Sequence, residues 1–237
     1  NSSELTGSNL EQYHVLIMKY KIDSFIYCDS GSCLDPFTVA NKLTEAKGIL
    51  NCKMEFCAGN ECGLATANSL AAIRCHISDI HTVVGGAGLL EGAPMEEIIL
   101  AVKFFELGMV CENTGDLADD CKKILDYMQL EIPVDKAIIG QGIFSHESGI
   151  HVDGIIKNPQ LYEIITPEEV GVKRKIIIGK HSGRAAIRTK YQMMGIELKE
   201  EEISVLMKEI RNLALSQNSS LTEKQLMDLY IACSGSD

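Results

Sequence analysis

Short apolar runs alternate with longer segments of helical periodicity in the first half of the chain. After a helical pattern over residues 9–20, three apolar runs predict strands at 24–28, 52–57 and 80–84. A segment of helical periodicity follows each run, at 35–48, 65–75 and 95–107. Strands that alternate with helices in this way indicate parallel βαβ units with right-handed crossovers.

The number of these units determines the fold class that we expect. Three βα units are too few for a closed (β/α)8 barrel, which needs eight, and the series begins with a helix. We therefore predict an α/β fold in which about three βα units form the C-terminal part of a (β/α)8 barrel whose front is absent.

The pattern changes after residue 112. A helix is predicted at 117–128, and Thr166 begins a capping box that predicts a short helix. A short strand at 176–178 and two C-terminal helices, the last capped by Thr222 with Gln225, complete the chain. The sequence thus predicts three parts: a partial barrel at 1–112, a linker helix with an α+β post-barrel region at 113–190, and a helical segment at 191–237.

The charge balance excludes several classes of partner. The 237 residues carry 22 Lys and Arg against 33 Asp and Glu, a net charge of -11, which argues against nucleic acid or an anionic membrane surface. The basic run at 173–175 is too short for a nucleic-acid patch and indicates a solvated rim or a small anion site. With no apolar run of about 18 residues and no visible signal peptide, we expect a cytoplasmic protein that does not cross a membrane.

The nine cysteines form no Cys-x-x-Cys pair. Cys52, Cys57 and Cys62 recur every five residues, a spacing that suits neither a zinc site nor a redox motif. We expect reduced thiols that are mostly buried.

Three further motifs have both a functional and a structural interpretation. The glycine-rich run at 85–92 lacks the last glycine of a dinucleotide-binding motif, which argues against NAD. The sequence HESGIH at 146–151 places its histidines five apart, so it does not fit a zinc-protease helix; it predicts either an acid–base loop or a satisfied polar loop. The sequence GKHSGR at 179–184 predicts either an anion site at a helix start or capping by Ser182.

Together, these motifs and others resemble the isopropylmalate/homocitrate synthase family over essentially the whole chain. The resemblance rests on FSHESGIHVDG at 144–154, KNP at 157–159, Tyr162, TPEEVG at 166–171 and GKHSGRAA at 179–186. In the first half it rests on CDS at 28–30, LDP at 34–36, Asn60, GLATAN at 63–68 and the Glu pair at 96–97. The sequence HVDG at 151–154 favours homocitrate synthase of the nitrogen-fixation type over bacterial isopropylmalate synthase, in which Gln is usual after that His.

The resemblance implies an acyltransferase that condenses acetyl-CoA with a 2-oxo acid on a barrel-bound divalent metal and then hydrolyses the thioester. It implies that His151 and Tyr162 serve proton transfer or thioester hydrolysis, with His146 and Glu147 in support. Four residues are expected to contact substrate: Ser30, Asn60, Lys180 and Ser182.

The sequence departs from the family at the metal. The family's ligand positions hold Cys57, Gly59 and Val84, and the strands that would carry the remaining ligand are absent. A single thiol cannot complete a metal site. We therefore predict no metal on this chain, and a divalent Mg, Mn or Zn ion on a partner chain with an intact barrel.

The resulting hypothesis is one subunit of a split homocitrate synthase, forming a heteromer that acts on acetyl-CoA and 2-oxoglutarate. Two rivals stay open: a non-catalytic regulatory or scaffolding paralogue, and a subunit of a related isopropylmalate or citramalate synthase. An uncovered barrel face also predicts an isolated chain that is poorly soluble or oligomeric.

Overall fold

The chain divides into two compact units, Asn1–Gly140 and Gln141–Asp237. The computed structural model describes residues 7–31, 34–87, 92–147, 154, 158 and 163–234. Each unit has its own cluster of buried apolar side chains, the first drawn from residues between 10 and 102 and the second from residues between 176 and 226.

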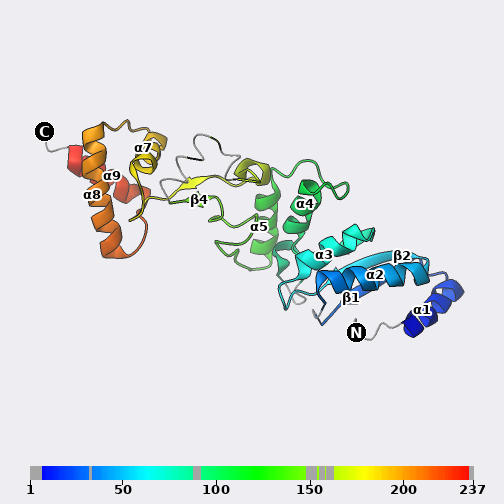
Figure 1. Ribbon diagram of the computed structural model, residues 1–237. Helices are drawn as coiled ribbons and strands as arrows, with labels where there is room; N and C mark the ends of the chain where they lie inside the picture. Colours follow the sequence, from blue (N-terminus) through cyan, green and yellow to red (C-terminus); the bar gives the residue numbers. More distant parts are fainter. Residues whose placement is uncertain are drawn as a thin grey trace. The chain divides into compact units, whose positions relative to one another are not determined.

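The first unit alternates strands and helices (Figure 1). Its elements are α1 (Gly7–Tyr20), β1 (Ser24–Asp29), α2 (Pro36–Leu50), β2 (Lys53–Ala58), α3 (Ala65–Arg74), β3 (Asp79–His81), the 3-10 turn η2 (Val84–Gly86), α4 (Met95–Phe104) and α5 (Leu117–Tyr127). The strands form a three-stranded parallel sheet in the order β1-β2-β3. The parallel βα repeat predicted from the sequence is confirmed.

Local capping explains where α2 begins. Asp35 stands just before the helix, and its Oδ1 accepts hydrogen bonds from the backbone N–H groups of Phe37, at 2.9 Å, and Thr38, at 3.1 Å. Pro36 occupies the first helical position, where its missing N–H costs nothing. The hydrogen bonds from Thr38 also lower the pKa of Asp35.

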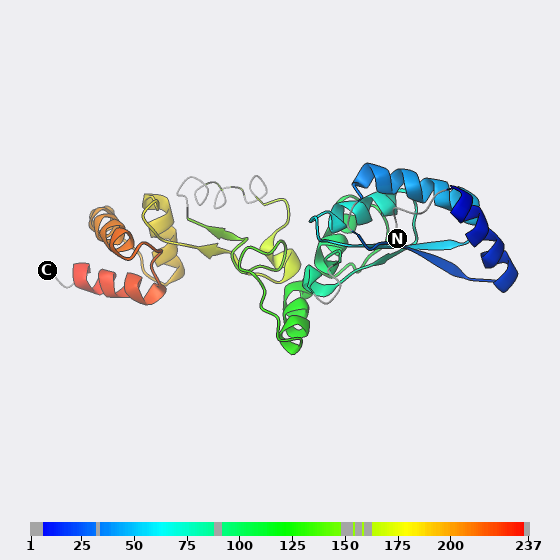
Figure 2. The same ribbon diagram turned by 90° about the horizontal axis from the view of Figure 1, so that it is seen from below.

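The two faces of the sheet differ sharply in polarity. Helices α2 and α3 cover one face, where Tyr27, Met54 and Phe56 are buried (Figure 2). The other face carries ion pairs between neighbouring strands, Lys53–Asp79 at 2.7 Å and Glu55–His81 at 2.9 Å. Parallel sheets are usually buried on both faces, so this polar face is an exception.

In its described residues, the second unit combines a short sheet with the helices α7, α8 and α9 (Figure 2). Its elements are β4 (Ser145–His146), the 3-10 turn η4 (Pro167–Val170), β5 (Lys175–Ile176), α7 (Arg184–Met193), α8 (Glu200–Gln217) and α9 (Glu223–Ser234). The two strands pair in parallel. The side chain of Tyr191 joins the helices, because its buried hydroxyl donates to the carbonyl of Leu226 at 2.7 Å.

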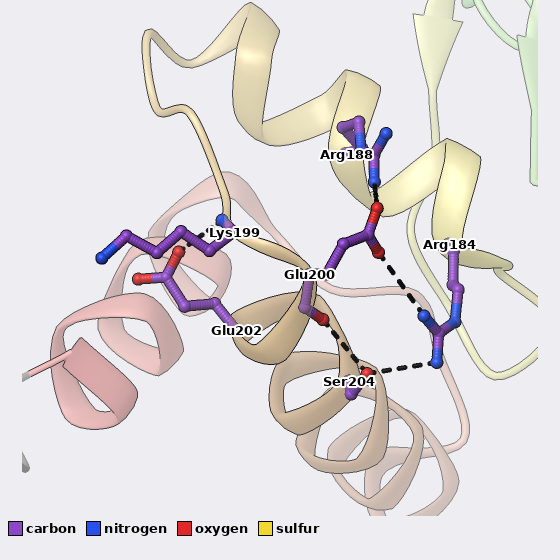
Figure 3. Close-up of polar contacts among 6 residues, drawn as sticks. All are labelled: Arg184, Arg188, Lys199, Glu200, Glu202 and Ser204. Atoms are coloured by element: carbon purple, nitrogen blue, oxygen red, sulfur yellow. Dashed lines mark hydrogen bonds and ion pairs between the residues drawn. The ribbon is translucent and has the colours of Figure 1, made fainter.

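Exposed polar contacts connect α7 to the start of α8 (Figure 3). The carboxylate of Glu200 accepts from Arg188 and lies 3.5 Å from Arg184, and Arg184 also donates to the hydroxyl of Ser204 at 3.1 Å. About half or more of each charged side chain in this group is exposed, so the contacts orient the helices without a large gain in stability.

Several sequence-based expectations need correction. The third strand ends at His81 rather than 84, because the backbone of Val83 forms hydrogen bonds with Ala93 and Met95 instead of continuing the pairing with β2. The strand β4 was not predicted, and the capping box at Thr166 is present but begins a 3-10 turn. Helix α5, expected as a linker helix, groups with the first compact unit: a Cβ at Gly85 would lie 2.9 Å from Leu125 Cδ1 of that helix.

The expectation of mostly buried cysteines was wrong. None of the eight cysteines in the described ranges forms a disulfide, and Cys121 alone among them is buried. Several of the others lie on the polar sheet face or in loops, which explains their exposure. No helix in the described part of the chain is long and apolar enough to span a membrane.

Candidate functional site

Strand β4 positions two of the predicted catalytic residues, His146 and Glu147. It pairs with β5, where the N–H of Ile177 donates to the carbonyl of His146 at 3.0 Å. This pairing joins two motifs that lie about 30 residues apart in the sequence, HESGIH at 146–151 and GKHSGR at 179–184.

The turn at 179–182 packs directly against Glu147. Gly179 has no side chain, and a Cβ there would collide with the carboxylate of Glu147. The N–H of Gly179 donates to the hydroxyl of Ser182 at 2.9 Å, and that hydroxyl lies 3.4 Å from the carbonyl of Glu147. A larger residue at 179 would therefore have to displace the carboxylate of Glu147 from its place against the turn.

Ser182 has a different role from helix capping. Gly183 is the N-cap of α7, and no side chain caps that helix. The hydroxyl of Ser182, with 3 % of the residue exposed, instead holds the turn together. Lys180, in the same turn, is exposed and can reach an anionic ligand.

A buried charge cluster lies beside His146. Glu163 is 7 % exposed. Its carboxylate accepts hydrogen bonds from two guanidinium nitrogens of Arg174, Nε at 2.8 Å and a terminal nitrogen at 2.5 Å. Nε2 of His146 lies 3.4 Å from Glu163 Oε1, close enough for an ion pair but not aligned as a hydrogen bond. The hydrogen bonds from Arg174 lower the pKa of Glu163, and the nearby His146 acts in the same direction.

This cluster corrects the interpretation of the basic run at 173–175 for its middle residue, whereas Lys173 and Lys175 are exposed, as a solvated rim predicts. Arg174 does not form a solvated rim or an anion site, because the carboxylate of Glu163 already occupies its guanidinium. Sequence reasoning missed Glu163 as well. The available signal was an acidic residue followed by two isoleucines inside the resemblance block.

The cluster allows simple proton chemistry. An imidazole next to a carboxylate is a pair of groups that can accept and donate protons. Nε2 of His146 is buried beside Glu163 Oε1 and makes no hydrogen bond to any described residue.

The other predicted site residues fall into two groups. His151 and Tyr162 lie outside the described residues. Ser30 and Asn60 belong to the first unit, where each follows the carboxyl end of a strand. Ser30 is exposed, whereas Oδ1 of Asn60 accepts a hydrogen bond from the N–H of Ala65 at the start of α3, at 3.2 Å.

The positions that hold the metal in the resembled family do not fit a metal here. Cys57 lies on β2, Gly59 forms a bridge with Gly92, and Val84 begins η2. Partial burial raises the pKa of the Cys57 thiol. One thiol, a glycine and a valine do not make the oxygen-rich set that Mg²⁺ or Mn²⁺ requires, and within the described ranges no group of three or more His, Cys, Asp or Glu residues could hold an ion.

A second charge cluster sits at the carboxyl end of the first unit's sheet. Glu96 is completely buried, and its Oε2 accepts from the N–H of Gly85 at 3.0 Å. Lys136 lies 3.4 Å from Glu96 and 2.5 Å from Glu97, which also accepts from Thr66 at 2.6 Å. The cluster fixes the turn after β3 rather than presenting groups for chemistry.

Comparison with known proteins identifies relatives of the chain. Residues 138–218 match the family described as homocitrate synthase post-HMGL domain-like. The chain is 37% identical over 213 residues to 2-isopropylmalate synthase 2 of Caldanaerobacter subterraneus, covering 88% of this chain and 54% of that protein. It is 36% identical over 213 residues to homocitrate synthase 1 of Nostoc sp., covering 86% of this chain and 55% of that protein.

A citramalate synthase is also among the relatives. The chain is 34% identical over 197 residues to (R)-citramalate synthase CimA of Methanocaldococcus jannaschii, covering 81% of this chain and 40% of that protein. Among solved structures, the HMG-CoA lyase of Bacillus subtilis matches 55% of this chain and 46% of its own chain, with 17% identity and a TM-score of 0.45. The chain thus spans about half the length of the curated relatives it matches.

Proposed function

We propose that this chain, which belongs to the homocitrate, isopropylmalate and citramalate synthase family, is one subunit of a homocitrate synthase. The reaction joins acetyl-CoA, 2-oxoglutarate and water to give homocitrate and CoA. The homocitrate would supply the iron–molybdenum cofactor of nitrogenase.

One observation carries the proposal. The pairing of β4 with β5 sets His146 and Glu147 against the turn at 179–182, so two separate motifs of the resemblance meet in one place. The presence of homocitrate synthases among the relatives supports the choice of reaction, including the AksA protein of Methanopyrus kandleri, which is 39% identical over 170 residues.

The residues of this chain would handle substrate and protons. His151 and Tyr162 move protons or assist hydrolysis of the thioester, and His146 and Glu147 support them. The exposed ammonium of Lys180 can bind a substrate carboxylate, while Ser182 holds the turn that presents it. In the first unit, Ser30 and Asn60 would contribute further substrate contacts.

A partner chain completes the enzyme in this proposal. The ligand positions on this chain hold Cys57, Gly59 and Val84, which do not fit a divalent cation. The partner would therefore supply an intact barrel with the metal, and this chain would supply the post-barrel region.

The test is an assay of thiol release from acetyl-CoA in the presence of 2-oxoglutarate. The partner is first isolated by co-purification with this chain from the source cells. We expect no activity from this chain alone and activity when the two are mixed. His151→Ala should lower the restored rate by about 10²–10⁴-fold while leaving the complex intact on gel filtration.

Two variants sharpen the assay. Tyr162→Phe should cost less than His151→Ala if its hydroxyl donates only one hydrogen bond. His76→Asn, an exposed histidine at positive φ in the first unit, is the matched control and should keep full activity. Full stimulation by the His151→Ala chain, or a partner that is fully active alone, would favour the scaffolding paralogue instead.

A second candidate substrate has its own support. The isopropylmalate synthase of Caldanaerobacter is 37% identical to the chain, a value close to the 36% of the Nostoc homocitrate synthase. The same assay, run with the 2-oxo acids that yield isopropylmalate and citramalate on acetyl addition, separates the three activities. If kcat/KM is higher for either of these acids than for 2-oxoglutarate, the corresponding isopropylmalate or citramalate synthase activity is assigned in place of homocitrate synthase.

A further inference from the structure

The register of the first unit's sheet sets two cysteines side by side. Cys28 on β1 and Cys57 on β2 are direct partners in the parallel pairing of the two strands. Neighbouring strands lie about 4.7–4.9 Å apart, and partners in register project from the same face. This spacing falls inside the Cα–Cα range of about 4.4–6.8 Å that a disulfide needs.

Both thiols lie on the polar face of the sheet, away from the helices. Cys28 is exposed and Cys57 is partly buried, so a small reagent can reach the pair. The next partner of Cys57 along the row is His81, whose ring is engaged with Glu55 at 2.9 Å. On the β1 side of Cys57, the neighbouring side chain in the row is therefore the thiol of Cys28.

The electrostatics of Cys57 agree with the placement that the strand register gives. The pKa of Cys57 is raised first by its partial burial and then by the charge of Cys28 and a hydrogen bond with it. Two thiols that influence each other in this way are within reach of one another.

Three of the other described cysteines are engaged elsewhere or buried. The thiol of Cys75 contacts Thr44 and the carbonyl of Ala40, and the thiol of Cys111 donates to the carbonyl of Asn113 at 3.0 Å. Cys121 is buried, so a small reagent cannot reach it as it can reach Cys28 and Cys57, and burial raises its pKa to about 11. Cys33 lies outside the described residues and is a competitor that the test must address.

We propose that Cys28 and Cys57 form a reversible disulfide when the chain meets a peroxide. The more exposed Cys28 thiol attacks hydrogen peroxide, breaking the O–O bond to give a sulfenic acid and one water. The Cys57 thiol then attacks that sulfur, forming the S–S bond and releasing a second water. The two sulfurs lose two electrons in total, the peroxide gains them, and a small dithiol such as dithiothreitol reverses the reaction.

The bond would tie β1 to β2 near their carboxyl ends. The loops that carry Ser30 and Asn60 begin immediately after these ends, so a cross-link here fixes the spacing of both loops. The pair is thus a modification site that is independent of the chemistry in the second unit.

The test uses the full chain with Cys33→Ser and Cys62→Ser. Trypsin cuts the sequence after Lys21, Lys42, Lys53 and Arg74, so Cys28 falls in peptide 22–42 and Cys57 in peptide 54–74. The two serine substitutions leave each peptide with a single cysteine. The protein is treated with hydrogen peroxide, blocked with N-ethylmaleimide, digested and analysed by mass spectrometry.

We expect peptides 22–42 and 54–74 to appear as one linked species that is two hydrogen atoms lighter than their sum. Dithiothreitol should release them, and Cys28→Ser or Cys57→Ser in the same background should abolish the species. Cys57→Ala is a second variant in case the serine chain does not fold, as judged by circular dichroism.

Two results would overturn the proposal. One is oxidation of Cys28 to sulfinic acid without any linked peptide. The other is a link from Cys28 to a different cysteine, either Cys33 in the wild-type chain or Cys52 or Cys75 in the double variant.

Discussion

Each unit buries a carboxylate against a cation, but the two clusters leave different groups unsatisfied. In the first unit Glu96 shares Lys136 with a second carboxylate, and its Oε1 has no hydrogen bond from any described residue. In the second unit one carboxylate, that of Glu163, lies beside both Arg174 and His146, and the atom without a hydrogen bond is His146 Nε2.

The difference indicates which cluster is structural and which is available for chemistry. The first cluster has an excess of negative charge and uses it to hold the N–H of Gly85 in the turn after β3. In the second cluster, the nitrogen Nε2 of His146 makes no hydrogen bond to a described residue, and it is a group that can carry a proton. A carboxylate paired with a cation thus fixes a backbone turn in the first unit, whereas in the second unit it lies beside the imidazole of His146.

Removing Glu163 should have the largest effect on stability. Glu163→Ala leaves the partly exposed guanidinium of Arg174 with only the more distant Glu168; breaking a fully buried pair costs about 3–5 kcal/mol, so we expect a loss near the lower end, about 3 kcal/mol. Hydrogen exchange measured peptide by peptide separates the two units and should show the loss in the second unit. Glu168→Ala is the matched control: Glu168 lies 3.8 Å from Arg174 but its side chain is 69% exposed, so about 0–1 kcal/mol is expected. Equal losses from the two variants would contradict the comparison.

The same carboxylate predicts how the second unit responds to acid. The pKa of Glu163 in the folded chain lies below its ordinary value of 4.5, because of the hydrogen bonds from Arg174. Its stabilisation is therefore complete above pH 4.5 and is lost as the pH falls through the lower, folded-state value. Glu163→Gln should flatten this acid limb in a denaturation series, and an unchanged slope would mean that other carboxylates dominate it.

A neutral amide in the first cluster should cost less. Glu96→Gln can still accept from the N–H of Gly85, and Lys136 keeps its contact with Glu97, so we expect a loss of about 1–3 kcal/mol. Exchange at the amide of Gly85 should quicken by more than exchange in the second unit. A loss as large as that from Glu163→Ala would show that the two clusters contribute equally to stability.

The exposed contacts of Glu200 give the smallest expected effect and a reference for both clusters. Glu200→Ala removes the pairs with Arg184 and Arg188, and its side chain is 61% exposed, so we expect about 0–1 kcal/mol (Figure 3). The difference from wild type should shrink further in 1 M salt, where the Debye length is about 3 Å. A larger loss that salt does not change would point to helix packing rather than charge.

Local signals explain which elements the sequence could predict. The starts of α2 and η4 depend on Asp35 and Thr166, whose side chains bond within the next three residues, and both starts were predicted. The strand β4 is two residues long and exists because it pairs with β5, about 30 residues away. No local pattern could indicate it.

The candidate site follows the same rule. The motifs around His146 and Ser182 were visible in the sequence, whereas their contact and the role of Glu163 were not. The run at 173–175 shows the limit most clearly. A basic tripeptide usually faces solvent, but the middle residue of this one turns to a buried carboxylate 11 positions earlier.

The polar face of the first unit's sheet sets a condition on any partner that covers it. The pairs Lys53–Asp79 and Glu55–His81 already form in water. Removing water from them on binding therefore adds little net free energy to association. Affinity must then come from apolar side chains elsewhere, and Val15, Met18 and Tyr20 along α1 are each more than half exposed. A subunit bound in this way would be exchangeable. It would dissociate on dilution without exposing an apolar sheet face to water. The complex would then form only where both chains are abundant.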